Sequence, residues 1–220
     1  MRSVRKSNIL WIMLPKKYIS YSQVSLWKRD KSAYRRKYYD GEPSVDTAYT
    51  MFGKEIHAQI EAGGLEHVPR YSKHEHEVRV NIEDVPVIGY IDSFAPRRCA
   101  IVEYKTGIRD ASNSPRWTQS KVQAHDQLPF YSMLVQQKYG KVHDETTLVW
   151  LETEWYEHES VEVFDGMELT GTERRLRLTG DIEIFKRTIE QWERDRMIEM
   201  LLSTAKEISE DYERYTKNSA

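Results

Sequence analysis

Three short runs of alternating apolar and polar residues, separated by tight turns, most constrain what this chain can fold into. The runs cover residues 78–82, 85–94 and 100–106, and turn residues stand between them at Glu83–Asp84 and Pro96–Arg98. Alternation with a period of two is typical of strands, and short turns join antiparallel neighbours. The sequence therefore predicts a three-stranded antiparallel meander.

Helical periodicity precedes and follows this meander. A capping-box pattern at Ser20–Gln23 begins a predicted helix over residues 21–38. A second helix is predicted over residues 48–62. A third is predicted from a capping box at Ser120 to about residue 138, and Pro129 should kink this helix or restart it.

The last part of the chain combines strands with a long helix. Apolar and β-branched runs predict strands over residues 146–151, 161–164 and 176–185, and an apolar stripe predicts a C-terminal helix over about 188–217. A length of 220 residues suits one domain. We expect a single α/β domain over residues 1–220, with a core at about 18–187 in which helices flank a central mixed β-sheet.

Hydropathy and cysteine content exclude several classes of protein. The most conspicuous apolar run, Ile9–Leu14, is far shorter than the roughly 20 residues needed to cross a bilayer, so no membrane partner is expected. Cys99 is the single cysteine, so it cannot close an intramolecular disulfide or by itself hold a structural zinc ion. This cysteine usage predicts a cytoplasmic, reducing environment.

The charges are distributed unevenly along the chain. Residues 1–39 carry 11 Lys or Arg against one acid, whereas residues 144–220 carry 10 against 20 acids. On the first predicted helix, aromatic residues interleave with a basic set made of Lys28, Arg29, Lys31, Arg35, Arg36 and Lys37. Such interleaving is typical of grooves that bind nucleic-acid strands. A solvated amphipathic face explains the same pattern equally well.

Two carboxylates and an ammonium group are predicted to meet on the meander. Asp92 ends the second strand, and Glu103 and Lys105 lie two residues apart on the third, hence on one face. Because the two strands are antiparallel neighbours, Asp92 can approach Glu103 across the ladder. Paired carboxylates suit Mg²⁺ or Mn²⁺, which lower the pKa of bound water, and the lysine can balance charge on a phosphoryl group. An ordinary Glu–Lys pair on a surface strand is the competing interpretation.

Two further spacings accompany this group. The segment Gly53–His57 places an imidazole on the predicted helix before the meander, and Gln127–Tyr131 places an amide and a phenol one helical turn apart after it. Each of these two spacings is, by itself, weak evidence for a functional site. A rival metal tract, His74–Glu77, does not have the HExxH spacing and would need further ligands to hold zinc.

Together and in this order, Gly53-x-x-x-His57, Gly89-x-x-Asp92, Glu103-x-Lys105 and Gln127-x-x-x-Tyr131 resemble the signature of PD-(D/E)XK nucleases of the RecB-like exonuclease branch. The resemblance implies a restriction-endonuclease-like core. It implies that Asp92, Glu103 and Lys105 are catalytic and that His57, Asp92, Glu103 and the Tyr104 carbonyl bind the metal. By the same resemblance, Gln127 and Tyr131 contact DNA or brace the active site.

The sequence departs from the family pattern at two points. Ile91 stands where the nominal motif has proline before Asp92. The iron–sulfur nucleases of this branch, including those of CRISPR adaptation, carry four cysteines, whereas this chain has only Cys99. We therefore expect no iron–sulfur cluster, and we expect packing to hold the basic N-terminal helix.

The resulting functional prediction is a Mg²⁺- or Mn²⁺-dependent deoxyribonuclease that acts on DNA, with exonuclease action expected first. Lys28, Arg29, Lys31, Arg35 and Arg36 are the candidate DNA contacts outside the active site. Two alternatives stay open, namely a structure- or sequence-selective endonuclease of the same fold and a non-catalytic nucleic-acid-binding or assembly module. A recombinase or helicase partner and an oligomeric state also stay open. No phosphate-binding GxxxxGK[ST] loop is present, so any helicase activity would come from another polypeptide.

Overall fold

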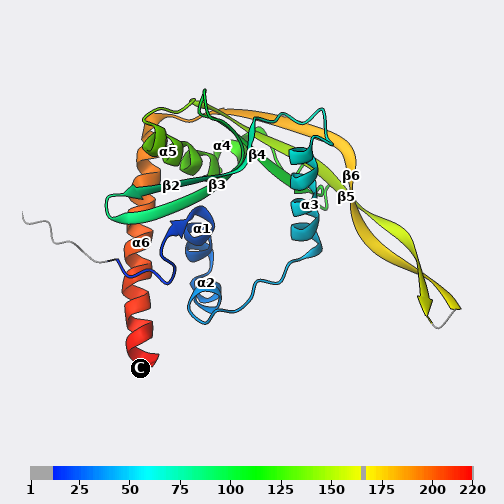
Figure 1. Ribbon diagram of the computed structural model, residues 1–220, viewed down its shortest axis with the longest axis horizontal. Helices are drawn as coiled ribbons and strands as arrows, with labels where there is room; N and C mark the ends of the chain where they lie inside the picture. The colour runs from blue at the N-terminus through cyan, green and yellow to red at the C-terminus, as the bar shows by residue number, and fades with distance from the viewer. Residues whose placement is uncertain (1–11, 165–166, 220) are drawn as a thin grey trace, which may run out of the picture.

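A six-stranded mixed sheet forms the centre of the structure in the computed structural model, which describes residues 12–164 and 167–219 (Figure 1). Its strands are β1 (Ile19–Ser20), β2 (Lys73–Ile82), β3 (Val85–Ala95), β4 (Ala100–Gly107), β5 (Glu145–Phe164) and β6 (Met167–Thr188). Strands β2, β3 and β4 pair in antiparallel fashion, which confirms the meander. The parallel pairing of β4 with β5 makes the sheet mixed, and the crossover between them carries two helices.

Helices lie on both sides of the sheet. They are α1 (Tyr21–Arg29), α2 (Lys31–Tyr38), α3 (Ala48–Ala62), α4 (Gln119–Gln123), α5 (Gln127–Tyr139) and the long α6 (Gln191–Ser219). Among the described residues, no helix is both long and apolar enough to cross a membrane. The mixed sheet, the helices on both of its sides and the length of α6 confirm the predicted α/β architecture with a long C-terminal helix. The single domain stays a prediction, and residues 1–11 lie outside the described residues.

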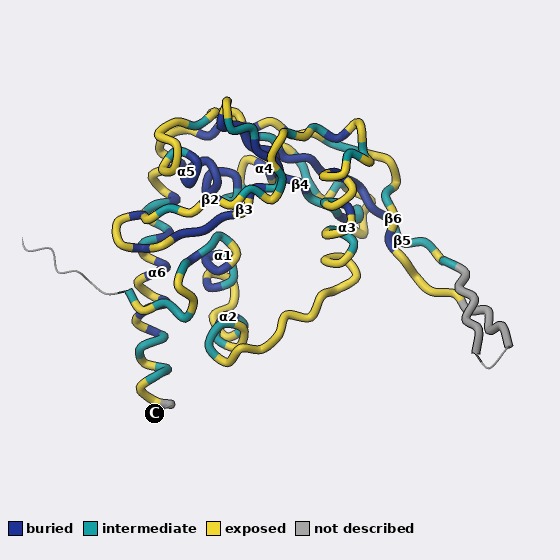
Figure 2. Tube along the Cα trace, viewed as in Figure 1, coloured by how far each residue is buried: buried dark blue, intermediate teal, exposed yellow. Residues whose placement is uncertain are grey.

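Two hydrophobic clusters cover the two faces of the sheet. The larger one joins α1, α5 and α6 to β2 and β3, and the smaller one joins α3 to β4 and β5 through residues such as Ile56, Tyr104 and Leu151. Buried positions concentrate in β3, β4 and α5, as Figure 2 shows, whereas much of the surface of α2 is exposed. The sheet and α5 thus form the rigid centre on which side chains can be positioned.

Helix boundaries differ from the predictions where a side chain caps a new helix. The predicted helix over 21–38 is two helices, because Asp30 has an extended backbone and its Oδ1 accepts a hydrogen bond from the Ala33 N–H at 2.9 Å. The helix predicted over 48–62 is confirmed at both ends, and Gly63 closes it with a positive φ of 87°.

The helical region after β4 also divides in two. Thr118, and not Ser120, caps α4, and the chain restarts as α5 at Gln127. Pro129 therefore lies in the first turn of α5, where the missing N–H leaves no hydrogen bond unmade. The C-terminal helix begins at Gln191, later than predicted, because β6 continues to Thr188.

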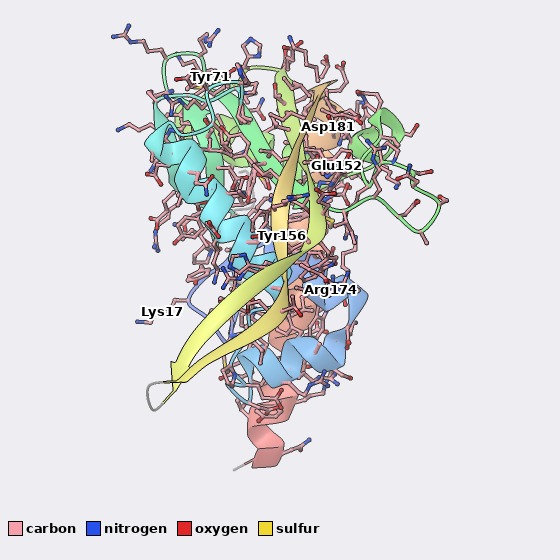
Figure 3. All side chains as sticks on the ribbon, turned by 90° about the vertical axis from the view of Figure 1, so that its right-hand side faces the viewer. Lys17, Tyr71, Glu152, Tyr156, Arg174 and Asp181 are labelled. Atoms are coloured by element: carbon pink, nitrogen blue, oxygen red, sulfur yellow. The ribbon has the colours of Figure 1, made fainter. Side chains whose placement is uncertain are left out.

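Strands β5 and β6 form one long hairpin where three shorter strands were predicted. Their register runs from Glu145↔Thr188 to Phe164↔Met167, with an irregularity between Leu151 and Thr153. The distal part of the hairpin leaves the sheet as an arm, which points toward the viewer in Figure 3 below the labelled residue Glu152. Trp155 joins the arm to α3 by donating to the Tyr49 hydroxyl at 3.0 Å.

Ion pairs and aromatic contacts fasten the basic N-terminal helices to the acidic α6. Arg35 donates to Asp211 at 2.6 and 2.8 Å, and Lys31 donates to Glu207 at 2.9 Å. Tyr39 donates to Asp211 at 3.1 Å and packs against Tyr212 with a ring separation of 4.8 Å. The opposite charges of the two ends of the chain therefore neutralise each other in part within the fold.

The pairing with Arg35 predicts a stability that depends on pH. Hydrogen bonds from Arg35 hold the pKa of Asp211 below its ordinary value. A carboxylate with a lowered pKa stabilises the folded state above its unfolded pKa of about 3.9, and this contribution is lost as pH falls through the folded pKa. We expect Asp211→Asn to lower the free energy of unfolding by about 1 kcal/mol at pH 7, because Arg35 is partly exposed, and to have almost no effect near pH 2.

Urea unfolding of both proteins across pH 2–7 checks this expectation. The matched control is Glu210→Gln on the same helix, since Glu210 approaches Lys206 only to 4.0 Å and both side chains are exposed. An equal loss of stability in the two variants, or a loss independent of pH, would contradict the role given to Arg35 and Asp211.

Candidate functional site

Along the edge of β3 that faces away from β2, the neighbouring strand changes from β1 to β4. Near its start β3 pairs with β1 at Val87 and Ile88, and near its end it pairs with β4 from Ser93 onward. In the described ladders no residue of the segment 89–92 pairs along this edge. Asp92 lies in this segment, and its Oδ2 accepts a hydrogen bond from the Tyr104 N–H of β4 at 2.7 Å. A side chain therefore replaces a backbone ladder bond where the two strands separate.

The regular alternation of side chains is also broken at this point. Ile91 and Phe94 are three residues apart, yet both belong to the larger hydrophobic cluster. In a regular strand such residues face opposite sides of the sheet. On the neighbouring strand, the β2–β3 register passes from His74↔Ser93 to His76↔Ile91, and Glu75 between them has a positive φ of 44°. Glu75 and Asp92 are thus opposite each other at the point where the side-chain alternation of β2 and β3 is interrupted.

Gly89 allows α5 to approach this irregular segment. A Cβ atom at Gly89 would lie 2.6 Å from Leu134 Cδ1 and 3.2 Å from Tyr131 Cε1. Both contacts are closer than van der Waals packing permits, so no side chain other than hydrogen fits there without movement. The glycine of the Gly89-x-x-Asp92 spacing therefore has a packing function, because it lets α5 carry Gln127 and Tyr131 to the sheet.

Three potential metal ligands, one of them Asp92, converge at this point. His57 of α3 places Nε2 at 3.9 Å from Asp92 Oδ2 and Nδ1 at 3.4 Å from Glu75 Oε1. One ligand atom from each of these residues lies within 4.8 Å of the others. They line a pocket of about 190 Å³ at the side of α3, together with Lys54, Glu61, His74 and Tyr104. The pocket is large enough for an ion with some of its water.

Glu103 is buried beside this group and is held by two donors. Its side chain is 2% exposed, and its Oε1 accepts hydrogen bonds from Lys105 Nζ at 2.5 Å and from Gln127 Nε2 at 2.6 Å. The Gln127 amide also donates to the Tyr131 hydroxyl at 3.1 Å. Glu103 Oε2 is buried and has no hydrogen-bond partner among the described residues. A buried carboxylate oxygen without a partner is costly unless a cation or solvent completes its shell.

Burial is the largest cause of the upward pKa shifts of Asp92 and Glu103. Burial raises the pKa of Asp92 to about 6, although Lys105 and the Tyr104 N–H favour its charged form. Burial, and then the charge of Asp92, raise the pKa of Glu103 well above its ordinary value. Burial lowers the pKa of Lys105, but the two carboxylates outweigh this effect and the net shift is upward. Lys105 is therefore an ammonium group at neutral pH.

The donor set fits a hard divalent cation. It offers carboxylate oxygens from Asp92 and Glu75, an imidazole from His57 and the unpartnered Oε2 of Glu103. Mg²⁺ and Mn²⁺ prefer oxygen ligands, and Mn²⁺ also accepts imidazole. A bound cation would offset the repulsion between these closely spaced carboxylates.

The other predicted site residues are placed in two groups. Tyr104 adjoins the pocket, with its ring 5.7 Å from that of His57, and Gln127 and Tyr131 lie behind Glu103. Of the predicted DNA contacts, Lys31 and Arg35 bind acids of α6, and Arg36 binds Glu42 at 3.6 Å. Lys28 and Arg29 are exposed at the end of α1 without an ion pair in the described part of the chain.

Sequence reasoning missed Glu75 as a member of the cluster. Its tract, His74–Glu77, was considered only for zinc, and the structure disperses that tract. His76 stacks on Phe94 at 4.6 Å, and Glu77 binds Arg79 and Tyr90. The alternation of a regular strand gives no reason to select Glu75, rather than its neighbours, as a metal ligand. Its coincidence with Asp92 in the β2–β3 register was the available signal, once the turn at Glu83–Asp84 was placed.

Comparison with known proteins gives a family and a fold. The family model described as the PD-(D/E)XK nuclease superfamily matches residues 25–217. A crystal structure from Eubacterium rectale, described as a candidate exonuclease, is 11% identical with a TM-score of 0.53, covering 96% of this chain and 88% of that one. A phage-related exonuclease from Haemophilus somnus 129PT is 18% identical with a TM-score of 0.47, covering 84% and 80%. No curated protein matches the sequence significantly. At 11% identity, the likeness to the Eubacterium rectale protein shows the fold alone.

The packing at Gly89 yields a test of the site's framework. Alanine normally stabilises a strand relative to glycine, but at position 89 its methyl group would collide with Leu134. We expect Gly89→Ala to lower the free energy of unfolding by about 1–3 kcal/mol, as measured by urea denaturation. Combining it with Leu134→Ala should cost less than the sum of the two single changes, because the shortened side chain makes room. Additive costs, or a stabilised Gly89→Ala protein, would contradict the close approach.

Proposed function

The chain belongs to the PD-(D/E)XK nuclease superfamily, and from this premise we propose that it is a Mg²⁺- or Mn²⁺-dependent deoxyribonuclease that removes nucleotides from the ends of linear DNA. The observation that carries the proposal is the meeting of His57, Glu75 and Asp92 within 4.8 Å of one another, next to the buried Glu103 and its ion-pair partner Lys105. Superfamily membership makes the chain a hydrolytic nuclease with a nucleic-acid substrate. Metal dependence, the choice of DNA and attack at ends are parts of the proposal.

In this proposal Asp92, Glu103, His57 and the Tyr104 carbonyl would hold the metal, and Glu75 would be an additional ligand. The bound cation would polarise a phosphate oxygen and lower the pKa of a bound water. Asp92 is oriented by the Tyr104 N–H, and Glu103 is oriented by Gln127. The main function of the protein residues is therefore to hold carboxylate oxygens in place before substrate arrives, which avoids reorganisation during the reaction.

Lys105 is assigned to the reacting phosphate. Its ammonium group donates to Glu103 Oε1, which leaves other N–H bonds for the attacking water or a phosphate oxygen. In the hydrolysis, the water oxygen forms a bond to phosphorus, a P–O bond of the DNA backbone breaks, and the water's protons end on the leaving oxygen and in solvent. Lys105 stays protonated throughout, because neighbouring carboxylates raise its pKa. Gln127 and Tyr131 are positioning residues that act through Glu103.

Attack at DNA ends is supported by the motif resemblance to the RecB-like exonuclease branch. The Eubacterium rectale protein of the same fold is itself described as a candidate exonuclease. An endonuclease with the same metal chemistry would cut covalently closed circles, whereas an exonuclease would leave them intact. A binding or assembly module would cut neither.

The proposal predicts the outcome of a cleavage assay on linear duplex, single-stranded and closed circular DNA. We expect linear substrates to be degraded with Mg²⁺ or Mn²⁺, the circle to persist, and EDTA to abolish cleavage. Lys105→Ala should slow cleavage about 10²- to 10³-fold, because one preorganised charge at the reacting phosphate is lost. The matched control is Lys206→Ala, which removes an exposed lysine of α6 and should leave the rate unchanged.

Each other result of the assay rejects a defined part of the proposal. Cleavage of the circle would establish an endonuclease. Cleavage that persists in EDTA would reject metal dependence, and equal rates for Lys105→Ala and the control would reject the role of Lys105. Retained DNA binding with no cleavage of any substrate would indicate the module.

The role of Glu75 is tested by metal binding without DNA. Glu75→Gln should weaken Mn²⁺ affinity, measured by titration calorimetry, by about tenfold or more, because a charged ligand is replaced by an amide. Glu77→Gln is the matched control on the same strand, since Glu77 binds Arg79 and Tyr90 outside the pocket. Unchanged affinity in Glu75→Gln would remove Glu75 from the ligand set.

A further inference from the structure

A second, larger pocket begins where β4 ends. It has a volume of about 710 Å³. Its lining comes from residues 108–111 of the loop after β4 and, on and beside α4, from Arg116, Trp117, Lys121, Ala124 and His125. Ile108 lies three residues after Lys105, and Arg116 packs on Gly107, the last residue of β4. The pocket therefore adjoins the end of the strand that carries Glu103 and Lys105. Glu152, labelled in Figure 3, lies beside this loop.

The charge of this pocket is opposite to that of the metal pocket. Arg109, Arg116 and Lys121 line it, and Asp110 is the one acid among its lining residues. The Asp110 carboxylate is occupied by its own turn, where its Oδ1 accepts from the Ser112 N–H and the Ser114 N–H at 2.9 Å. A basic pocket next to an acidic metal pocket is suited to phosphates on either side of a scissile bond.

Two of the three cations keep donors for a ligand. Arg109 is bound to Glu152 at 2.7 Å, so its charge is already balanced. Arg116 is exposed and makes no ion pair in the described part of the chain. Lys121 donates one hydrogen bond to the Arg116 carbonyl at 2.9 Å, and an ammonium has three donors. Arg116 and Lys121 are therefore the groups available to a phosphate.

An aromatic wall completes the pocket. Trp117 is partly exposed and lies 4.9 Å from His125 in an edge-to-face arrangement, which holds its ring in place. His125 in turn lies 6.1 Å from Tyr21 at the start of α1. A supported tryptophan beside two free cations is the combination that binds unpaired nucleotides, with the base stacked on the ring and the phosphate paired with the cations.

We propose that this pocket binds an unpaired nucleotide of the substrate strand next to the scissile phosphate, with its base on Trp117 and its phosphate on Arg116 and Lys121. The inference rests on the proposed nuclease function and adds a substrate class, namely single-stranded or frayed ends. A base that is paired inside a duplex is covered by its neighbours and cannot stack on a side chain. The volume lies within the usual range for pockets that bind small ligands, about 300–1,000 Å³, and leaves room for one nucleotide.

The test is binding of a fluorescein-labelled single strand of six thymidines in EDTA, which prevents metal-dependent cleavage. Trp117→Ala should weaken binding about fivefold or more, and Trp117→Phe should keep most of it because a stacking ring remains. The matched control is Trp192→Ala, which removes a tryptophan that is 63% exposed on α6 and should bind as wild type. Equal affinities for Trp117→Ala and the control would overturn the proposal.

Arg116→Gln gives an independent test, because this exposed side chain can change without disturbing the core. It should weaken binding and reduce the slope of log affinity against log salt concentration by about one phosphate contact. Arg175→Gln, an exposed arginine paired with Glu173 on the arm, is the control and should leave the slope unchanged. An unchanged slope in Arg116→Gln would overturn the assignment even if Trp117→Ala fails to fold.

Failure of this inference can be distinguished from failure of the nuclease proposal. If wild type cleaves linear DNA but the Trp117 and Arg116 variants bind the labelled strand normally, the pocket is not a nucleotide site. If the variants lose binding while wild type cleaves nothing, the pocket stands and the nuclease proposal falls.

Discussion

The structure depends on how the buried carboxylate of Glu103 is stabilised. A charge taken out of water costs several kcal/mol unless partners replace the lost solvent, so Glu103 needs Lys105, two residues along its own strand, and Gln127, from the start of α5. The pairing with Gln127 ties the beginning of α5 to the centre of the sheet. Gly89 makes that position possible by leaving room for Tyr131 and Leu134. The unpartnered Oε2 would be available to a bound cation.

In the described ladders, residues 89–92 of β3 form no pairs with β1 or β4, and this gap brings Glu103 close to side chains from other elements. Strand β3 exchanges β1 for β4 as its neighbour, and the alternation of its side chains breaks between Ile91 and Phe94. As a result, Asp92 contacts both Tyr104 of β4 and His57 of α3. Potential metal ligands from several elements therefore lie around one small pocket. Beyond the end of β4, the basic pocket adds the positive charge that a phosphate backbone requires.

Internal ion pairs change the interpretation of the uneven charge distribution along the chain. The basic N-terminal segment and the acidic C-terminal segment suggest a polyanionic partner when they are considered separately. In the fold, Lys31 and Arg35 are bound by acids of α6, and tyrosines pack between the helices. Much of the basic charge on α2 therefore stabilises tertiary structure. Arg109, Arg116 and Lys121, which sequence composition did not single out, line a pocket that begins just after β4, the strand that carries Glu103 and Lys105.

The sequence by itself determined the local parts of this protein. The bounds of α3, the β2–β4 meander and the approach of Lys105 to Glu103 follow from capping, turns and side-chain periodicity, which act between near neighbours in the chain. Only the tertiary structure decided the membership of Glu75, the exchange of partners along β3 and the long β5–β6 hairpin. These features depend on contacts between distant segments and on a left-handed residue inside a strand, and no local periodicity records either of them.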